Sequence, residues 1–315
     1  ILDESTSKYF FDSGMFVIAY NFPPQPVTNW FIFFIANGVT SDGTDLLKGP
    51  GRSNRKVSLE KVNFNITGNV SFKLIKKEVI IEGNCYENYT LEDGDQLDII
   101  STNKTVYGYL AISGNFEVQF HWNSCSTNTK ANVGANDGKK LDKNQLIKIL
   151  DTHSHKSKRK LEYINSKIEN IRVIKGTNFD YFSEMSKKNF FEKEFSVTKL
   201  TDRMGMRLEG QKIENIVDTN IKSEGIIKGV IQVPADGNPI IMLSDHGTIG
   251  GYPKIGVVIT ADYDRLVQLQ PGSKIKFKEV DLSDAQMLFK LYEMETQNLV
   301  SAIKWILSQK FLVLF

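Results

Sequence analysis

The chain has 315 residues, of which 41% are hydrophobic and 24% are charged, and its formal net charge at pH 7 is +2. This composition is that of an ordinary globular protein and excludes a disordered or fibrous class, while the length predicts two domains or one domain with two lobes. Because acidic and basic residues nearly balance, we expect neither a nucleic-acid nor a membrane partner.

The first half of the chain has the pattern of a β-rich lobe. Its most apolar early segment, Trp30 to Ala36 (WFIFFIA), is too short to span a membrane and predicts a buried strand or helix turn. Alternating apolar residues in Val70 to Ile81 and Val106 to Ile112 are typical of strands. Cys85 and Cys125 fit neither a disulfide framework nor a zinc pattern, so we expect reduced thiols, no metal and a cytoplasmic location.

A polar linker and a long terminal helix complete the predicted organisation. Asp151 to Asn170, rich in Lys, His and Ser, separates two β-rich halves, so we place the lobes at residues 1–155 and 156–290. Helical spacing extends from Asp284 to Phe315, and residues 291–315 are assigned to a C-terminal helix. The apolar residues that we expect near one packing face of this helix are Met287, Leu288, Leu291, Met294, Leu299, Ile303 and Leu307.

A hairpin carries the most chemically distinctive segment of the second half. Gly229 to Val233 and Pro239 to Leu243 predict two strands joined by a turn with Asp-Gly at its tip. The second strand leads into Ser244 to Val258, SDHGTIGGYPKIGVV, which predicts a glycine loop on a rigid β scaffold. A strand from Ile255, a short helix over 262–269 and a strand over 274–280 follow.

Three familiar kinds of site do not fit this loop. A Walker phosphate loop requires Gly-Lys-Ser/Thr before a helix, whereas Gly251 precedes Tyr252, Pro253 and a strand. Asp245 and His246 are adjacent and would point to opposite faces of an extended chain, which disfavours a metal site and a Ser-His-Asp relay. What remains is either a set of donors for an amide, ureido or carboxylate group, or a tight structural turn.

The second half also resembles a known family. The resemblance is dense in Thr201 to Gly210 (TDRMGMRLEG), in Ser223-Glu224, and in Gly229 to Phe277 (GVIQVPADGNPIIMLSDHGTIGGYPKIGVVITADYDRLVQLQPGSKIKF). These phrases are similar to the biotin-dependent carboxyltransferase family, that of allophanate hydrolase subunit 2, also called KipA or the 5-oxoprolinase C component. The first 60 residues diverge from that family, and Cys125 stands where it has arginine.

The resemblance implies a mainly β fold of two cyclophilin-like β-barrel lobes with a few short helices. It also implies activity within a complex that contains an allophanate hydrolase subunit 1-type partner (PxpB- or KipI-like) and an ATP-linked PxpA-type partner. Such a complex opens 5-oxo-L-proline to L-glutamate. The chain has no Met-Lys-Met biotinylation site and no ATP-binding loop, so we expect partners to supply ATP and any biotin.

Two other functions stay open beside an amidohydrolase component. One is a carboxyltransferase component that uses N-carboxybiotin on a urea- or amide-like acceptor, and the other is a non-catalytic KipA-type regulator. Either chemistry must hold an amide-like acceptor and stabilise negative charge on oxygen.

We therefore assign site roles within the family-like phrases of the second half. The predicted catalytic residues are Lys254 as the cation, Thr248 as a donor and Asp245 as an orienting group. We interpret His246 as a hydrogen-bonded structural histidine rather than a general base. The predicted substrate-binding residues are Gln232, Gly250, Gly251, Tyr252, Asp202, Arg203 and Arg207. An alternative interpretation of Asp202, Arg203 and Arg207 is that they form structural ion pairs.

Overall fold

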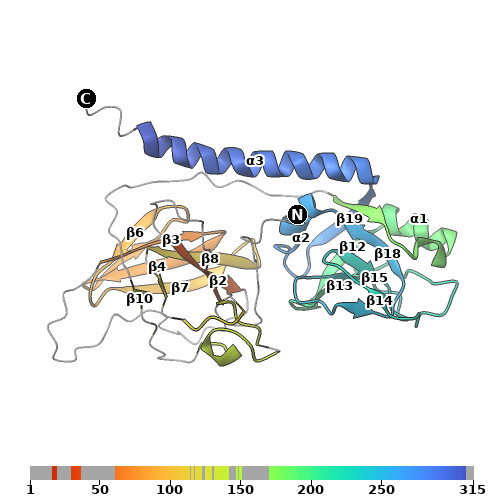
Figure 1. Ribbon diagram of the computed structural model, residues 1–315, viewed down its shortest axis with the longest axis horizontal. Helices are drawn as coiled ribbons and strands as arrows, with labels where there is room; N and C mark the ends of the chain where they lie inside the picture. Colours follow the sequence, from red (N-terminus) through yellow and green to blue (C-terminus); the bar gives the residue numbers. More distant parts are fainter. Residues whose placement is uncertain are drawn as a thin grey trace. The chain divides into compact units, whose positions relative to one another are not determined.

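The computed structural model describes residues 16–19, 30–36, 61–113, 115–116, 118–122, 125–129, 131–141, 147, 149–150 and 170–309. The chain divides into two compact units, the first comprising Ile1–Asn165 with Gln268–Gln270, and the second Ser166–Val267 with Pro271–Phe315 (Figure 1). Strands dominate both units, which confirms the predicted mainly β fold. The domain boundaries predicted at residues 155 and 290 stay predictions, and nearly all of the predicted linker lies outside the described residues.

The described part of the first unit consists of two larger sheets and one two-stranded sheet. The five-stranded sheet has the order β1-β2-β8-β3-β6, the three-stranded sheet has the order β5-β4-β7, and β10 pairs with β9. The elements are β1 (Phe16–Ala19), β2 (Trp30–Ala36), β3 (Val62–Thr67), β4 (Val70–Lys76), β5 (Val79–Glu82), β6 (Asn88–Leu91), β7 (Gln96–Thr102), β8 (Tyr107–Ser113), β9 (Asn115–Phe116), β10 (Ile149–Leu150) and the 3-10 helix η1 (Asn136–Gly138).

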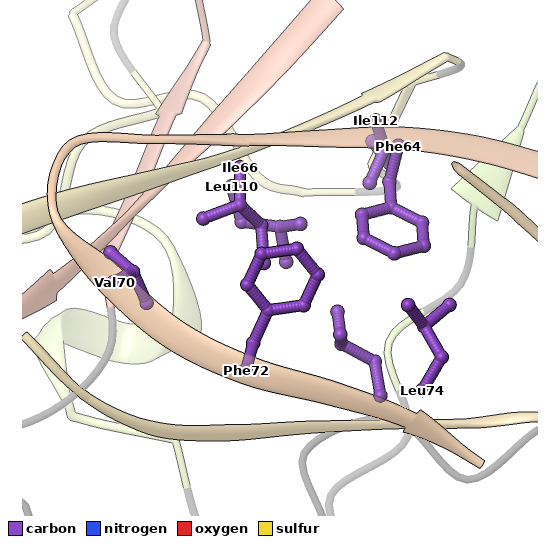
Figure 2. Close-up of a cluster of buried hydrophobic side chains, with 8 residues drawn as sticks. Phe64, Ile66, Val70, Phe72, Leu74, Leu110 and Ile112 are labelled. Atoms are coloured by element: carbon purple, nitrogen blue, oxygen red, sulfur yellow. The ribbon is translucent and has the colours of Figure 1, made fainter. Parts of the chain in front are cut away.

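Alternate residues of these strands form the core of the first unit. Phe64 of β3, Phe72 of β4 and Leu110 of β8 belong to one buried cluster, and Figure 2 shows their side chains facing one another across the space between strands. Because successive side chains of a strand point to opposite faces, each strand contributes every second residue. The two larger sheets therefore share one apolar interior, as the alternation in the sequence predicts.

The segment from Val70 to Ile81, predicted to be strand-like, is a hairpin. Strand β4 ends at Lys76 and β5 begins at Val79, with Lys77 and Glu78 at φ values of 45° and 72°. Two successive positive φ values are the requirement of a type I′ turn, which usually contains Asn or Gly. Lys-Glu lacks that signature, so the turn was not visible in the sequence.

The second unit is built on a closed barrel of seven strands in the order β11-β18-β15-β16-β13-β12-β19. The barrel closes because β11 pairs with β19 in parallel, with Ile171 opposite Phe277. Its elements are β11 (Ile171–Lys175), β12 (Glu194–Thr201), β13 (Gly205–Gly210), β15 (Val230–Gln232), β16 (Ile240–Met242), β18 (Lys254–Val258) and β19 (Lys274–Glu279). Outside it lie η2 (Phe179–Tyr181), α1 (Glu184–Glu192), β14 (Glu224–Gly225), β17 (Ile249–Gly250), α2 (Thr260–Leu266) and α3 (Leu282–Gln309).

Helix α1 was not predicted and supplies an aromatic group to the barrel core. Phe190 is fully buried and stacks on Phe277 of β19 with ring centroids 4.5 Å apart. The helix begins after Ser183, whose hydroxyl accepts a hydrogen bond from the backbone N–H of Ser186. This N-cap serine was the local signal for a helix start.

The C-terminal helix is present, but the apolar residues whose side chains the structure describes do not share one packed face. The predicted Leu299, Ile303 and Leu307 have side chains outside that described part. Ala285, Leu288 and Tyr292 pack against the core residues of α2 and its preceding segment. Met287 and Leu291, which the sequence placed near the same face, are 55% and 49% exposed. Adjacent residues of a helix lie about 100° apart, so spacings of three and four can trace two separate faces.

Among the described residues, no helix is both long and apolar enough to cross a membrane.

Candidate functional site

The predicted hairpin is present and leads into the polar loop. Ile231 of β15 pairs with Ile241 of β16 in antiparallel register, and the loop follows β16 directly. Strand β18 begins at Lys254 rather than at Ile255, so the predicted cation is held by the barrel itself. A strand position fixes the backbone of Lys254 more firmly than a loop position would.

The loop is held in place by the segment at residues 221–226. Strand β14 pairs with β17 in antiparallel register, with Glu224 opposite Gly250. The Ile221 N–H donates to the Gly251 carbonyl at 2.9 Å, and the Ile226 N–H donates to the Thr248 carbonyl at 3.1 Å. This pairing brings Glu224 to the loop that precedes Lys254.

Lys254 is the centre of a polar cluster with Glu224 and Asn178. The residue is 4% exposed, and its Nζ contacts Glu224 Oε2 and donates to Asn178 Oδ1 at 3.1 Å. Asn178 Oδ1 also accepts the backbone N–H of Lys254 at 3.1 Å. One amide oxygen therefore binds both ends of the lysine, which fixes the direction of its side chain.

Gly176 allows the chain to approach Lys254 closely enough for the Asn178 contacts. A Cβ atom at Gly176 would lie 2.3 Å from the Lys254 carbonyl oxygen, a distance that no ordinary contact permits. The Gly176 N–H donates to the Ile255 carbonyl at 3.0 Å, and the Asn178 N–H donates to the Lys254 carbonyl at 3.3 Å. The segment that carries Asn178 is thus hydrogen-bonded to β18 at Lys254 and at the residue after it.

Glu224 is the exposed member of the cluster. Its side chain is 44% exposed, whereas that of Lys254 is 5% exposed. The hydrogen bond from Lys254 lowers the pKa of Glu224 below its ordinary value, against a smaller opposing effect of burial. The arrangement places a buried ammonium group beneath a carboxylate that solvent reaches.

Gln232 lies beside this cluster and beneath the glycine loop. It is 3% exposed, and its Nε2 donates to the Tyr252 carbonyl at 3.2 Å. A Cβ atom at Gly250 would lie 2.6 Å from Gln232 Nε2, so only a glycine allows the loop backbone to lie this close to the Gln232 amide. Gln232 also pairs with Lys254 across β15 and β18. The structure therefore brings Gln232, Gly250 and Lys254 together, as the predicted site requires.

Asp245 and Arg203 are placed together in a different contact. Arg203 Nη2 lies 2.5 Å from Asp245 Oδ2, and the two side chains are 5% and 8% exposed. The Asp245 N–H donates to the Arg203 carbonyl at 2.9 Å. This ion pair fastens the start of the loop to the turn between β12 and β13.

Asp202 and Arg207, the other predicted members of that group, have separate partners. Asp202 Oδ1 accepts the backbone N–H groups of Met204 and Gly205 at 2.8 and 3.1 Å. Arg207 Nη1 lies 3.2 Å from Asp236 Oδ2 at the tip of the predicted hairpin. The structure thus gives Asp202, Arg203 and Arg207 contacts with different neighbours.

The remaining predicted residues lie at the surface of the loop. Thr248 is exposed and Tyr252 is 38% exposed. His246 Nδ1 lies 2.6 Å from the Gly247 carbonyl, which fits the structural interpretation of this histidine. Among the residues that the structure describes, no group of three or more His, Cys, Asp or Glu residues is placed to hold a metal ion.

Comparisons with known proteins identify the family. The family model described as "Carboxyltransferase domain, subdomain A and B" matches residues 57–279. The chain belongs to this carboxyltransferase-domain family, which confirms the predicted resemblance.

Named relatives and a solved structure agree with this assignment. The chain is 31% identical over 229 residues to the C component of 5-oxoprolinase from Haemophilus influenzae, and the match covers 73% of each protein. It is 30% identical over 199 residues to the Escherichia coli protein of the same name, covering 62% of this chain and 63% of the relative. The crystal structure of the Kluyveromyces lactis urea amidolyase matches 91% of this chain with a TM-score of 0.71 at 19% identity. That match covers 19% of the amidolyase, and at 19% identity it shows the fold alone.

Two residues of the central cluster were missed as site residues. The sequence marked Glu224 only as part of the Ser-Glu phrase, and it did not mark Asn178. Glu224 lies 30 residues before Lys254 in the chain, and Asn178 lies 76 residues before it. The usable signal was the family phrase at Ser223-Glu224, while Asn178 had no local pattern to mark it.

Proposed function

We propose that the chain is the C component of an ATP-dependent 5-oxoprolinase complex, which opens 5-oxo-L-proline to L-glutamate together with partner proteins. The similarity to two proteins that carry this name supports the function. The observation that carries it is the buried Lys254 held between Glu224 and Asn178, beside the amide of Gln232. This set of charges and amide groups suits a small lactam.

In the proposed reaction, water adds to the lactam carbonyl carbon and the ring C–N bond breaks, leaving a carboxylate and an amine. Negative charge develops on the carbonyl oxygen as that carbon becomes tetrahedral. Lys254 stabilises the charge, and the Gln232 amide and the backbone of Thr248, Gly250 and Gly251 orient the ring. Glu224, at the solvent-facing side of the cluster, accepts a proton from the attacking water and passes it to the ring nitrogen as the C–N bond breaks.

The partners and cofactors follow from this proposal. An allophanate hydrolase subunit 1-type protein and an ATP-linked PxpA-type protein complete the complex, and ATP binds to a partner rather than to this chain. The complex works in the cytoplasm. Asp202, Arg203, Asp245 and Arg207 then act through the loop and hairpin that they brace, and Tyr252 borders the ring-binding surface.

A second candidate is a carboxyltransferase component that moves a carboxyl group from N-carboxybiotin to a urea- or amide-like acceptor. The family description, which names a carboxyltransferase domain, favours it. In this reaction the C–N bond between biotin and the carboxyl group breaks, a new C–N bond forms to the acceptor nitrogen, and the proton lost by that nitrogen ends on the biotin nitrogen. The same lysine and amide groups would stabilise the acceptor.

Reconstitution with the two partner types tests these functions. The measurement is ATP hydrolysis with and without 5-oxo-L-proline, together with the amount of L-glutamate formed. We expect 5-oxoproline-dependent turnover only when all three chains are present. Dependence on an added biotinylated carrier and bicarbonate would favour the carboxyltransferase. Stable binding to the partners without either reaction would favour a KipA-type regulator and contradict the proposal.

A further inference from the structure

Helix α3 carries a second apolar face that the second unit does not cover. Its first face, formed by Ala285, Leu288 and Tyr292, packs on the segment around α2. The other apolar residues, Met287, Leu291 and Met294, are 55%, 49% and 58% exposed. Figure 1 shows α3 as one long, continuous helix, so this second face lies along a regular surface.

The exposed residues follow the spacing of a coiled-coil seam. Met287, Leu291, Met294 and Asn298 are separated by four, three and four residues, which places them at successive d, a, d and a heptad positions. Surface helices of monomeric proteins usually place polar residues on the face away from the core. Two methionines and a leucine in consecutive seam positions are instead typical of a helix that meets another helix.

We propose that α3 mediates a parallel two-stranded contact with α3 of a second copy of this chain. Two features of the described helix argue for a second copy in parallel. The first is Asn298, because a single asparagine at an a position favours a defined register and oligomeric state in coiled coils.

The second feature is the charge of the residues that flank the seam. Lys290 and Glu295 are both exposed and occupy g and e positions on opposite sides of it. In a parallel pair, the g residue of one helix faces the following e residue of the other. Lys290 of each copy therefore faces Glu295 of the other copy, which gives two equivalent ion pairs. In an antiparallel pair with the same seam residues in contact, g positions face g positions and e positions face e positions, so Lys290 and Glu295 would not meet. Charge complementarity therefore selects the parallel arrangement.

The first test is the mass of the full-length chain in solution. Sedimentation and light scattering from low to high micromolar concentrations should show a reversible shift from 35.7 kDa towards twice that mass. Leu291→Lys should raise the dissociation constant by about tenfold or more, because it places a charge in the apolar seam. Glu293→Lys, at an exposed c position of the same helix, is the matched control and should associate like the parent.

The second test examines the register. Lys290→Glu should weaken association, and adding Glu295→Lys should restore it. Met294→Cys should form a disulfide-linked dimer under mild oxidation, since equal d positions face each other in a parallel pair, while Glu293→Cys should not. The thermal unfolding of each variant is compared with that of the parent at a concentration where both are monomeric. An unchanged midpoint shows that a change in association does not come from a change in folding.

Three results would overturn the proposal. The proposal is wrong if the chain stays at the monomer mass at every concentration, even if the seam then binds a helix of another protein. It is also wrong if a dimer forms and Leu291→Lys does not weaken it. A dimer whose dissociation constant is unchanged by Lys290→Glu and by the added Glu295→Lys would refute the parallel arrangement.

Discussion

Replacing Lys254 with methionine should remove activity while leaving the fold intact. Methionine keeps an unbranched apolar side chain of similar length in the buried place, with sulfur for one methylene, and lacks the ammonium group. The deleted group loses its hydrogen bond to Asn178 and its contact with Glu224. Asn178 keeps its hydrogen bond from the backbone N–H of residue 254, and Glu224 is 44% exposed, so water can solvate the carboxylate.

The expected loss of stability follows from these contacts. A hydrogen bond from a charged group contributes about 1.5–3 kcal/mol net, and a half-exposed ion pair adds about 0–1 kcal/mol. Part of this loss is offset because the buried methionine carries no charge to desolvate. We therefore expect Lys254→Met to lower the free energy of unfolding by about 2 kcal/mol, below the loss of about 3–5 kcal/mol typical of breaking a fully buried pair. Loss of a group that stabilises the developing oxyanion should reduce kcat by about 100- to 1000-fold.

The assay is 5-oxoproline-dependent ATP hydrolysis in the reconstituted complex, with urea unfolding of the isolated chain measured in parallel. Lys276→Met, which removes an exposed lysine from β19, is the control and should retain parent activity. Activity of Lys254→Met within about threefold of the parent would refute the role of the ammonium group, since threefold corresponds to less than about 1 kcal/mol. Collapse of the fold would instead show that the lysine is structural.

Three further predictions follow from the second unit. Asp262 is fully buried and binds Arg172 through its backbone N–H, Nε and Nη2, so Asp262→Ala should lower the unfolding free energy measured in urea by about 3 kcal/mol; an unchanged midpoint would contradict this. Gly250→Ala should displace the Gln232 amide and raise KM while leaving Tm close to that of the parent. Parent-like kinetics would argue against the contact between residue 250 and Gln232. Because the pKa of Glu224 is lowered in the folded state, its contribution to stability is present above the ordinary glutamate pKa and is lost as pH falls through the lowered value. Glu224→Gln should therefore match the parent in acid and be less stable near neutral pH, whereas equal stability at every pH would count against the pair.

The sequence was most informative where structure depends on neighbouring residues. The hairpin around Asp236-Gly237 was predictable because the turn residues and both strands lie within one short segment. The helix from Leu282 was predictable from its spacing, although spacing did not show that its apolar residues form two faces. The turn at Lys77-Glu78 was missed because its positive φ values have no matching residue signature.

The candidate site was predictable only in part because it joins distant segments. Lys254, Gln232 and Gly250 lie in or beside one β scaffold, and the sequence placed all three in the site. Glu224 reaches Lys254 through the pairing of β14 with β17, which involves too few residues to leave a strand pattern. Asn178 reaches it because Gly176 tolerates a close backbone approach, a tertiary requirement that no local motif records.

The parallel pairing of β11 with β19 has a consequence for synthesis of the chain. Strand β19 lies between β11 and β12, so the first two strands of the barrel each obtain one neighbour from its last strand. Contacts between such distant segments form slowly because a long loop must close first. On the ribosome, the barrel must wait until residues 274–279 have emerged, and a nascent chain that stops earlier leaves two strand edges open to other chains.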